Sequence, residues 1–188
     1  MSPVSFQAID KNLEHVFCAD YLFEVPGYQR PYSWKTEHAQ ALFDDILEFV
    51  RSDGNSKKIT ELPAYFLGSI LLIKKTSDPK ADIVDGQQRL TTLTILLSAI
   101  RSLHNERAVK EAITEVIYQK GNKVTGAENI YRLKLRDRDQ GFFQKYIQAE
   151  DGFEKLLVFN EQLKDSQENI RANARLFAEK LGKLTGEE

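Results

Sequence analysis

Residues 81–89 read Ala81-Asp-Ile-Val-Asp-Gly-Gln-Gln-Arg89 and join a short apolar segment to a long amphipathic one. The first four residues predict a strand, and Asp85-Gly86 is a strong turn pair. Apolar residues then recur at three- and four-residue steps, which predicts a helix from about Arg89 to His104. A strand that turns directly into a helix needs a sheet with helices packed against it, so we expect a fold of mixed α and β structure.

Four further segments precede this junction. The sequence predicts a short helix over residues 5–15, a strand over residues 21–25 and a helix from Thr36 to about residue 52. Residues 65–73 are almost continuously apolar, which is typical of a strand covered on both faces.

The segments that follow the junction are mostly helical. We expect one strand with a basic face over residues 132–136. We also expect four helices, over residues 108–118, 140–149, 153–162 and 166–184. The fold class is therefore α+β. A mixed sheet with helices occupies residues 1–104, and a mostly helical lobe with one short basic strand occupies residues 105–188.

Composition excludes several classes of protein. The chain has 188 residues and a single cysteine, so it needs no disulfide to fold, and a reducing cytoplasm is expected. No run of 18 apolar residues predicts a membrane span. Sequence signatures of P-loop nucleotide-binding proteins, dinucleotide-binding folds and zinc sites are absent from the sequence. A formal net charge of −2 argues against a surface that binds nucleic acid everywhere, but it permits a local basic groove.

The Asp-Gly-Gln-Gln-Arg turn carries groups that suit a phosphate-bearing ligand. Gly86 permits a tight turn and a close approach, and the helix that follows offers an N-terminus that attracts anions. Arg89 presents a planar fork for phosphate oxygens, while Gln87 and Gln88 can orient a water or hold a ribose or base. Asp85 can hold Mg²⁺ through water or accept a proton from an attacking water.

These roles define a candidate site. The catalytic candidates are Asp85, Gln87, Gln88 and Arg89, and the phosphate-binding candidates include Gly86 and Thr91. Asp85 is also the candidate ligand for Mg²⁺ bound with a nucleoside triphosphate. The structural alternative is an ordinary helix start with polar caps.

A second motif, Tyr28-Gln-Arg-Pro-Tyr-Ser-Trp34, predicts an extended aromatic loop, because Pro31 disfavours helical angles at Arg30. Gln29 and Arg30 are candidates for phosphate contact, and the aromatic residues are candidates for stacking on a base. For Tyr32 and Trp34 we favour the alternative that they are core residues. Tyr28, Gln29 and Arg30 remain candidate DNA or base contacts.

A third candidate is the basic stripe of residues 132–138, which is suited to a nucleic-acid backbone. It comprises Arg132, Lys134, Arg136 and Arg138. The favoured alternative is a solvated strand face that Asp137 and Asp139 balance.

Five segments, taken together, resemble one bacterial family. They are Val25-Pro-Gly-Tyr-Gln-Arg-Pro-Tyr-Ser-Trp34, Tyr65-Phe-Leu-Gly-Ser-Ile70, Ile83-Val-Asp-Gly-Gln-Gln-Arg-Leu-Thr-Thr-Leu93, Arg132-Leu-Lys-Leu135 with Asp139, and Asn169-Ile-Arg-Ala-Asn173. The chain resembles the N-terminal domain of GmrSD-type restriction endonucleases, which is related to the ParB/sulfiredoxin-like fold.

The resemblance implies that the Asp-Gly-Gln-Gln-Arg motif binds and hydrolyses a nucleoside triphosphate. It also implies anti-phage defence by modification-dependent restriction of DNA, in concert with a His-Asn-His (HNH) nuclease domain or subunit. The chain has three histidines and no histidine cluster, so we expect that it is not itself a nuclease.

Two further functions remain open. One is a non-catalytic DNA-sensing module that reads the DNA backbone or its modification through Tyr28, Gln29 and Arg30. The other is a helical interaction scaffold. The nucleotide preference, the DNA modification and a homo-oligomeric state are also left open.

Overall fold

The computed structural model describes residues 6–54, 64–122 and 124–186. Its larger sheet has four strands in the order β2-β3-β1-β6. β1 (Leu22–Glu24) runs parallel to β3 (Lys80–Asp85) and to β6 (Leu133–Lys134), whereas β2 (Leu71–Lys74) is antiparallel to β3 at the edge. The predicted mixed sheet is therefore confirmed, while the likeness to the ParB/sulfiredoxin fold stays a prediction.

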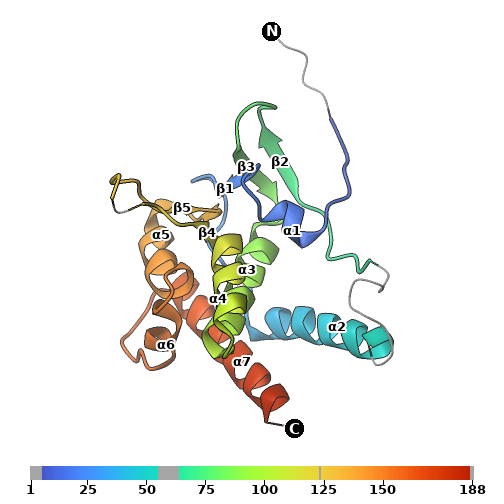
Figure 1. The fold of residues 1–188 in the computed structure, drawn as a ribbon, viewed down its shortest axis with the longest axis vertical. Coiled ribbons are helices and arrows are strands. Elements are labelled where there is room, and N and C mark those ends of the chain that lie inside the picture. The colour runs from blue at the N-terminus through green and yellow to red at the C-terminus, as the bar shows by residue number, and fades with distance from the viewer. Residues whose placement is uncertain (1–5, 55–63, 123, 187–188) are drawn as a thin grey trace.

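One helix, α3 (Gln87–Leu103), lies near the centre of the fold, below the sheet in Figure 1. Twelve of its side chains are buried, which is typical of a helix that packs against neighbours on several sides. α4 (Arg107–Ile117) and α7 (Asp165–Thr185) pack against it, and α2 (Thr36–Gly54) packs against α7.

The C-terminal part is mostly helical, as predicted. β4 (Tyr118–Gln119) and β5 (Ile130–Tyr131) form a separate two-stranded sheet. α5 (Asp137–Phe143) continues into a π-helical turn, η2 (Gln144–Gln148), which is followed by α6 (Gly152–Leu157).

The predicted lobes, residues 1–104 and 105–188, share one sheet and one hydrophobic core. β6 from the second lobe pairs with β1 from the first. The core contains Phe23 and Ile83 of the sheet, Leu90 of α3 and Phe177 of α7. Among the described residues, no helix has both the length and the apolar character that crossing a membrane requires.

The prediction of a strand over residues 65–73, covered on both faces, is wrong. Only β2 forms, and it starts six residues later at Leu71. Phe66 is 80% exposed and Ile73 is 64% exposed. β2 lies at the sheet edge with β3 as its partner, so its apolar residues are not enclosed.

The helix predicted over residues 5–15 is also wrong in extent. A single turn forms, α1 (Leu13–Val16), and residues 6–12 are not helical, while Ser5 lies outside the described residues. The Asn12 side chain accepts a hydrogen bond from the His15 N–H and so caps the helix at this point. Two other predicted helices differ as well, because residues 140–149 divide between α5 and η2, and α6 ends at Leu157.

The basic stripe does not form an open face. Arg132 is buried, with 7% of its surface exposed. Lys134 lies 3.7 Å from the Asp137 carboxylate, and Arg136 bonds Asp139. The pairing with Asp137 and Asp139 matches the alternative interpretation, but Arg132 and Asp139 are buried rather than solvated.

Candidate functional site

The turn between β3 and α3 is shaped by Gly86. This glycine adopts φ 94°, a left-handed conformation, and a Cβ atom there would lie 3.2 Å from Ile70 Cγ1 and 3.3 Å from the Ser69 carbonyl oxygen. Gly86, the N-cap residue of α3, makes no side-chain capping hydrogen bond, and no other described side chain caps this terminus. The first N–H groups of a helix have no partner within it, so this terminus remains available to an anion.

The loop of residues 28–34 is bonded directly to this turn. Gln29 Nε2 donates to the Val84 carbonyl oxygen at 2.9 Å. Gln87 Nε2 lies 3.2 Å from both Gln29 Oε1 and the Arg30 carbonyl oxygen, and donates to them. Two sequence motifs more than 50 residues apart therefore form a single surface.

Gln88 holds the second half of the loop. Its Oε1 accepts hydrogen bonds from the backbone N–H groups of Ser33 at 2.8 Å and Trp34 at 3.2 Å. Its Nε2 donates to the Pro31 carbonyl oxygen at 3.1 Å. Gln88 is only 6% exposed, so both ends of its amide serve the loop backbone.

Tyr32 anchors the loop from inside. Its hydroxyl lies 2.7 Å from Thr92 Oγ1 and accepts a hydrogen bond of 2.7 Å from Asn173 Nδ2. Asn173 also donates to the Trp34 carbonyl oxygen at 2.9 Å. Burial raises the pKa of Tyr32 to about 12, so the phenol stays neutral. Tyr32 is a core residue, as the alternative interpretation held, and Trp34 packs against the core.

A third segment reaches the site through Gly68 and Ser69. Arg89 Nη1 donates to the Ser69 carbonyl oxygen at 3.2 Å. Gly68 adopts φ 100°, and a Cβ atom there would lie 2.6 Å from Arg89 Cζ. The guanidinium therefore rests against bare backbone, which a side chain at residue 68 would displace.

A fourth contact comes from the segment after β6. Arg136 Nη1 donates to the Gln29 carbonyl oxygen at 3.3 Å, and Nη2 donates to Asp139 Oδ2 at 3.1 Å. Ser166 Oγ, in the first turn of α7, donates to Asp139 Oδ1 at 2.6 Å. The helical part of the chain is thus bonded to the loop.

The side chains nearest the turn differ in what remains open to a ligand. Asp85 and Arg30 are exposed, Tyr28 is 76% exposed, and Arg89 is half-buried. Thr91 is 1% exposed and donates its hydroxyl hydrogen to the Gln87 carbonyl oxygen. The groups that can meet an anion are therefore chiefly arginines.

A cavity of about 10 Å³ lies beneath the loop, close to the size that a single water needs. Polar groups from both motifs and from the helical part contribute to its wall, including Arg30, Gln87, Thr91, Arg136 and Asp139. Within the described ranges, no three or more His, Cys, Asp or Glu side chains gather as a metal site would require. Asp85 is a single carboxylate at this turn, so Mg²⁺ would take further ligands from substrate oxygens, which is the usual way that proteins hold this ion.

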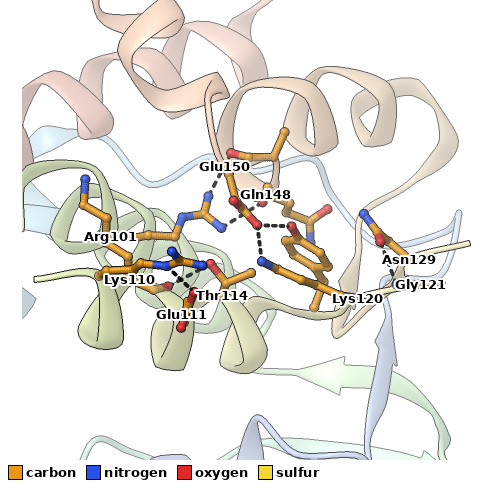
Figure 2. A network of polar contacts seen from close by, with 12 residues as sticks. Arg101, Lys110, Glu111, Thr114, Lys120, Gly121, Asn129, Gln148 and Glu150 are labelled. Carbon is orange, nitrogen blue, oxygen red and sulfur yellow. Dashed lines mark hydrogen bonds and ion pairs between the residues drawn. The ribbon is translucent and has the colours of Figure 1, made fainter. Parts of the chain in front are cut away.

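A separate polar cluster lies where α3 meets η2 and the β4–β5 sheet (Figure 2). The Arg101 guanidinium donates to the carbonyl oxygens of Ile147, Gln148 and Ala149 at 3.0, 3.1 and 2.8 Å. Burial lowers the pKa of Arg101. Arg101 lies in the last turn of α3, and its guanidinium bonds the backbone of a neighbouring element.

Glu150 belongs to the same cluster. Its Oε1 accepts a hydrogen bond from the Tyr118 hydroxyl and forms an ion pair with Lys120 Nζ, both at 2.8 Å (Figure 2). The hydrogen bond to Lys120, followed by the one to Tyr118, lowers the pKa of Glu150. With Arg101, the cluster ties β4 to the segment after η2.

Sequence reasoning brought the two central motifs together but missed several residues around them. Gly68 and Ser69 were hidden in an apolar run. Asn173 occurred only as part of a segment that resembles the family, Asp139 occurred there and as a counter-charge to the basic stripe, and Arg136 was a candidate DNA contact. The five segments that resemble the family all lie at residues 28–34 or at the adjoining turn. Their co-occurrence in the sequence was the one signal that could have identified these residues.

Comparison with known proteins gives one family. The family described as "GmrSD restriction endonuclease, N-terminal domain" matches residues 8–186, nearly the whole chain. Among curated proteins, none matches the chain.

Proposed function

Because the chain belongs to the GmrSD restriction endonuclease N-terminal domain family and is thus a component of a restriction system, we propose that it binds and hydrolyses a nucleoside triphosphate. The phosphates bind at the turn between β3 and α3, together with Mg²⁺. Hydrolysis regulates modification-dependent restriction of DNA in anti-phage defence. An HNH nuclease domain or subunit cuts the DNA.

One observation carries the proposal. Gln87 bonds both Gln29 and the Arg30 backbone, so the loop carrying Arg30 is held at the turn that carries Arg89. Two guanidinium groups and the uncapped N-terminus of α3 then act on one ligand. This combination of planar cations and helix N–H groups suits the oxygens of a triphosphate.

Each group has a role in phosphoryl transfer. Arg30 and Arg89 neutralise charge on the phosphate oxygens, and the helix N-terminus adds donors. Asp85, an exposed carboxylate at the same turn, holds Mg²⁺ through water. Mg²⁺ neutralises charge on the phosphates.

Gln87 orients the attacking water. Its Nε2 is bonded to the loop, whereas its Oε1 has no partner among the described residues and can accept a hydrogen bond from water. The water attacks the γ-phosphorus, the bond to the β–γ bridging oxygen breaks, and the water proton passes to the released phosphate. Gln88, whose amide is occupied by the loop, contributes by positioning rather than by contact.

The DNA-sensing alternative rests on a different observation. Tyr28 is 76% exposed beside the exposed Arg30, so an aromatic ring and a cation project together from the loop. Such a pair can stack on a base and contact the backbone. A sensing module that does not hydrolyse nucleotides would bind DNA with an affinity that falls as salt rises and falls further in Arg30→Ala.

Release of inorganic phosphate from the four nucleoside triphosphates tests the proposal. We expect Mg²⁺-dependent turnover with at least one nucleotide, and a loss of at least tenfold in Asp85→Asn. The control is Asp20→Asn, another exposed carboxylate. Equal rates in both variants would remove Asp85 from the mechanism, and no turnover in the wild type would favour the sensing alternative.

A further inference from the structure

Arg136 links the helical part of the chain to the nucleotide loop. It lies between β6 and α5, and its Nη1 reaches the Gln29 carbonyl oxygen, 107 residues earlier in the chain, at 3.3 Å. Its other terminal nitrogen, Nη2, bonds the Asp139 carboxylate at 3.1 Å. The side chain is 18% exposed, so it is directed into the protein rather than toward a surface ligand.

Asp139 in turn is held by α7. Its side chain is 2% exposed, and Ser166 Oγ donates to its second oxygen, Oδ1, at 2.6 Å. Both carboxylate oxygens are therefore occupied, one by a cation and one by a hydroxyl. A buried ion pair with its remaining oxygen satisfied holds a defined geometry, because breaking it leaves a charge unpaired.

We propose that Arg136 is a positioning residue for the nucleotide site. Resting on the proposed function, this inference holds that Arg136 fixes the Gln29–Arg30 backbone and thereby directs the Arg30 guanidinium to the phosphates. Ser166, Asp139 and Arg136 form the route by which the placement of α5 and α7 reaches that guanidinium. Arg136, a candidate DNA contact on sequence grounds, thus acts inside the domain.

The loop itself provides a test without nucleotide. Hydrogen–deuterium exchange of peptides covering residues 26–34 is expected to be at least fivefold faster in Arg136→Ala, because the Gln29 backbone loses its anchor. Ser166→Ala, which touches neither the loop nor a ligand, is expected to show a smaller increase in the same peptides. The control is Arg138→Ala, an exposed arginine two residues away. Exchange in both test variants equal to that of the control would overturn the positioning role.

A double-mutant cycle tests the route to Arg30. The dissociation constant of the preferred nucleotide is measured for the wild type, Arg30→Ala, Arg136→Ala and the double variant. We expect Arg136→Ala to weaken binding five- to twentyfold in the wild type and to add less than twofold in the Arg30→Ala background. Ser166→Ala is expected to weaken binding two- to fivefold.

Independent, multiplicative losses together with an inert Ser166→Ala would show that Arg136 contacts the ligand itself, and would overturn the inference. If Arg136→Ala does not fold, Ser166→Ala carries both measurements alone, and its failure to change either exchange or affinity would overturn it. A wild-type chain that binds no nucleotide would defeat the proposed function, whereas the exchange data would still decide whether Arg136 positions the loop.

Discussion

Asn173, in the last helix, donates a hydrogen bond of 2.7 Å to the hydroxyl of Tyr32, 141 residues earlier in the chain. It also bonds the Trp34 carbonyl oxygen, so one fully buried amide ties α7 to the loop beside the turn. The candidate site is therefore held by the helical part of the chain as well as by the sheet. Removing a side chain that makes such contacts should lower the free energy of unfolding or weaken ligand binding.

Asn173→Ala is expected to lower the free energy of unfolding by about 1–3 kcal/mol, because it leaves a buried hydroxyl and a carbonyl without a donor. Urea unfolding measures the change. Asn169→Ala is the control, one turn earlier on the same helix and only half-buried. Equal losses in the two variants would mean that the anchor contributes nothing beyond an ordinary helix position.

Gly68→Ala is expected to weaken nucleotide binding at least tenfold, because the added Cβ would lie 2.6 Å from Arg89 Cζ and displace the guanidinium. Gly126→Ala is a matched control: it also has a positive φ, 74°, but a Cβ there meets nothing within 4 Å. Both variants carry about 1–2 kcal/mol of backbone strain. Only the first should lose affinity, and similar losses in both would contradict the placement of Arg89.

Stability should fall in alkaline solution through Tyr32. Burial raises its pKa to about 12 from an ordinary value of 10.0. Above pH 10 the unfolded chain releases this proton while the folded chain keeps it, so rising pH favours unfolding. The loss reaches about 2 kcal/mol at pH 12.

Tyr32→Phe tests this assignment. Its unfolding free energy should decline less steeply between pH 10 and 12 than that of the wild type. Some decline should remain in Tyr32→Phe, because the pKa of Tyr118 is also raised, chiefly by desolvation. Parallel profiles for the two proteins would show that Tyr32 titrates normally.

Arg101→Met should cost at least about 2 kcal/mol, because three backbone carbonyls around η2 lose a charged donor. Thermal or urea unfolding measures this loss. Arg107→Met serves as the control, since its ion pair with Glu111 lies at the surface, where solvent screens such pairs and they contribute little to stability. A loss at residue 101 no greater than at residue 107 would contradict the role of the guanidinium.

Local chemistry explains which features the sequence could predict. Asp85-Gly86 marks a turn by its residue types, and the spacing of Leu90, Leu93 and Leu96 marks a helix, so the central junction was predicted correctly. The strand predicted over residues 65–73 was wrong because an apolar run does not indicate whether a strand lies at the centre or at the edge of a sheet. β2 lies at the edge.

The anchors of the site are the harder part, because they are non-local polar contacts. The sequence around Gln88 predicts a ligand-binding residue, yet its amide bonds the backbone of Pro31, Ser33 and Trp34. No pattern within a short window identifies a partner 55 residues away. The same holds for Arg136, whose partner Gln29 lies in a different motif.

The most direct test of the shared phosphate site is the shift in melting temperature when each of the four nucleoside triphosphates is added with Mg²⁺. Binding at about 100 times Kd adds roughly 2.7 kcal/mol, or about 5–10 °C for a chain of this size. We predict such a shift for at least one nucleotide, its loss in Arg89→Ala and Arg30→Ala, and its retention in the Arg138→Ala control. No shift in the wild type, or an undiminished shift in both arginine variants, would contradict the account.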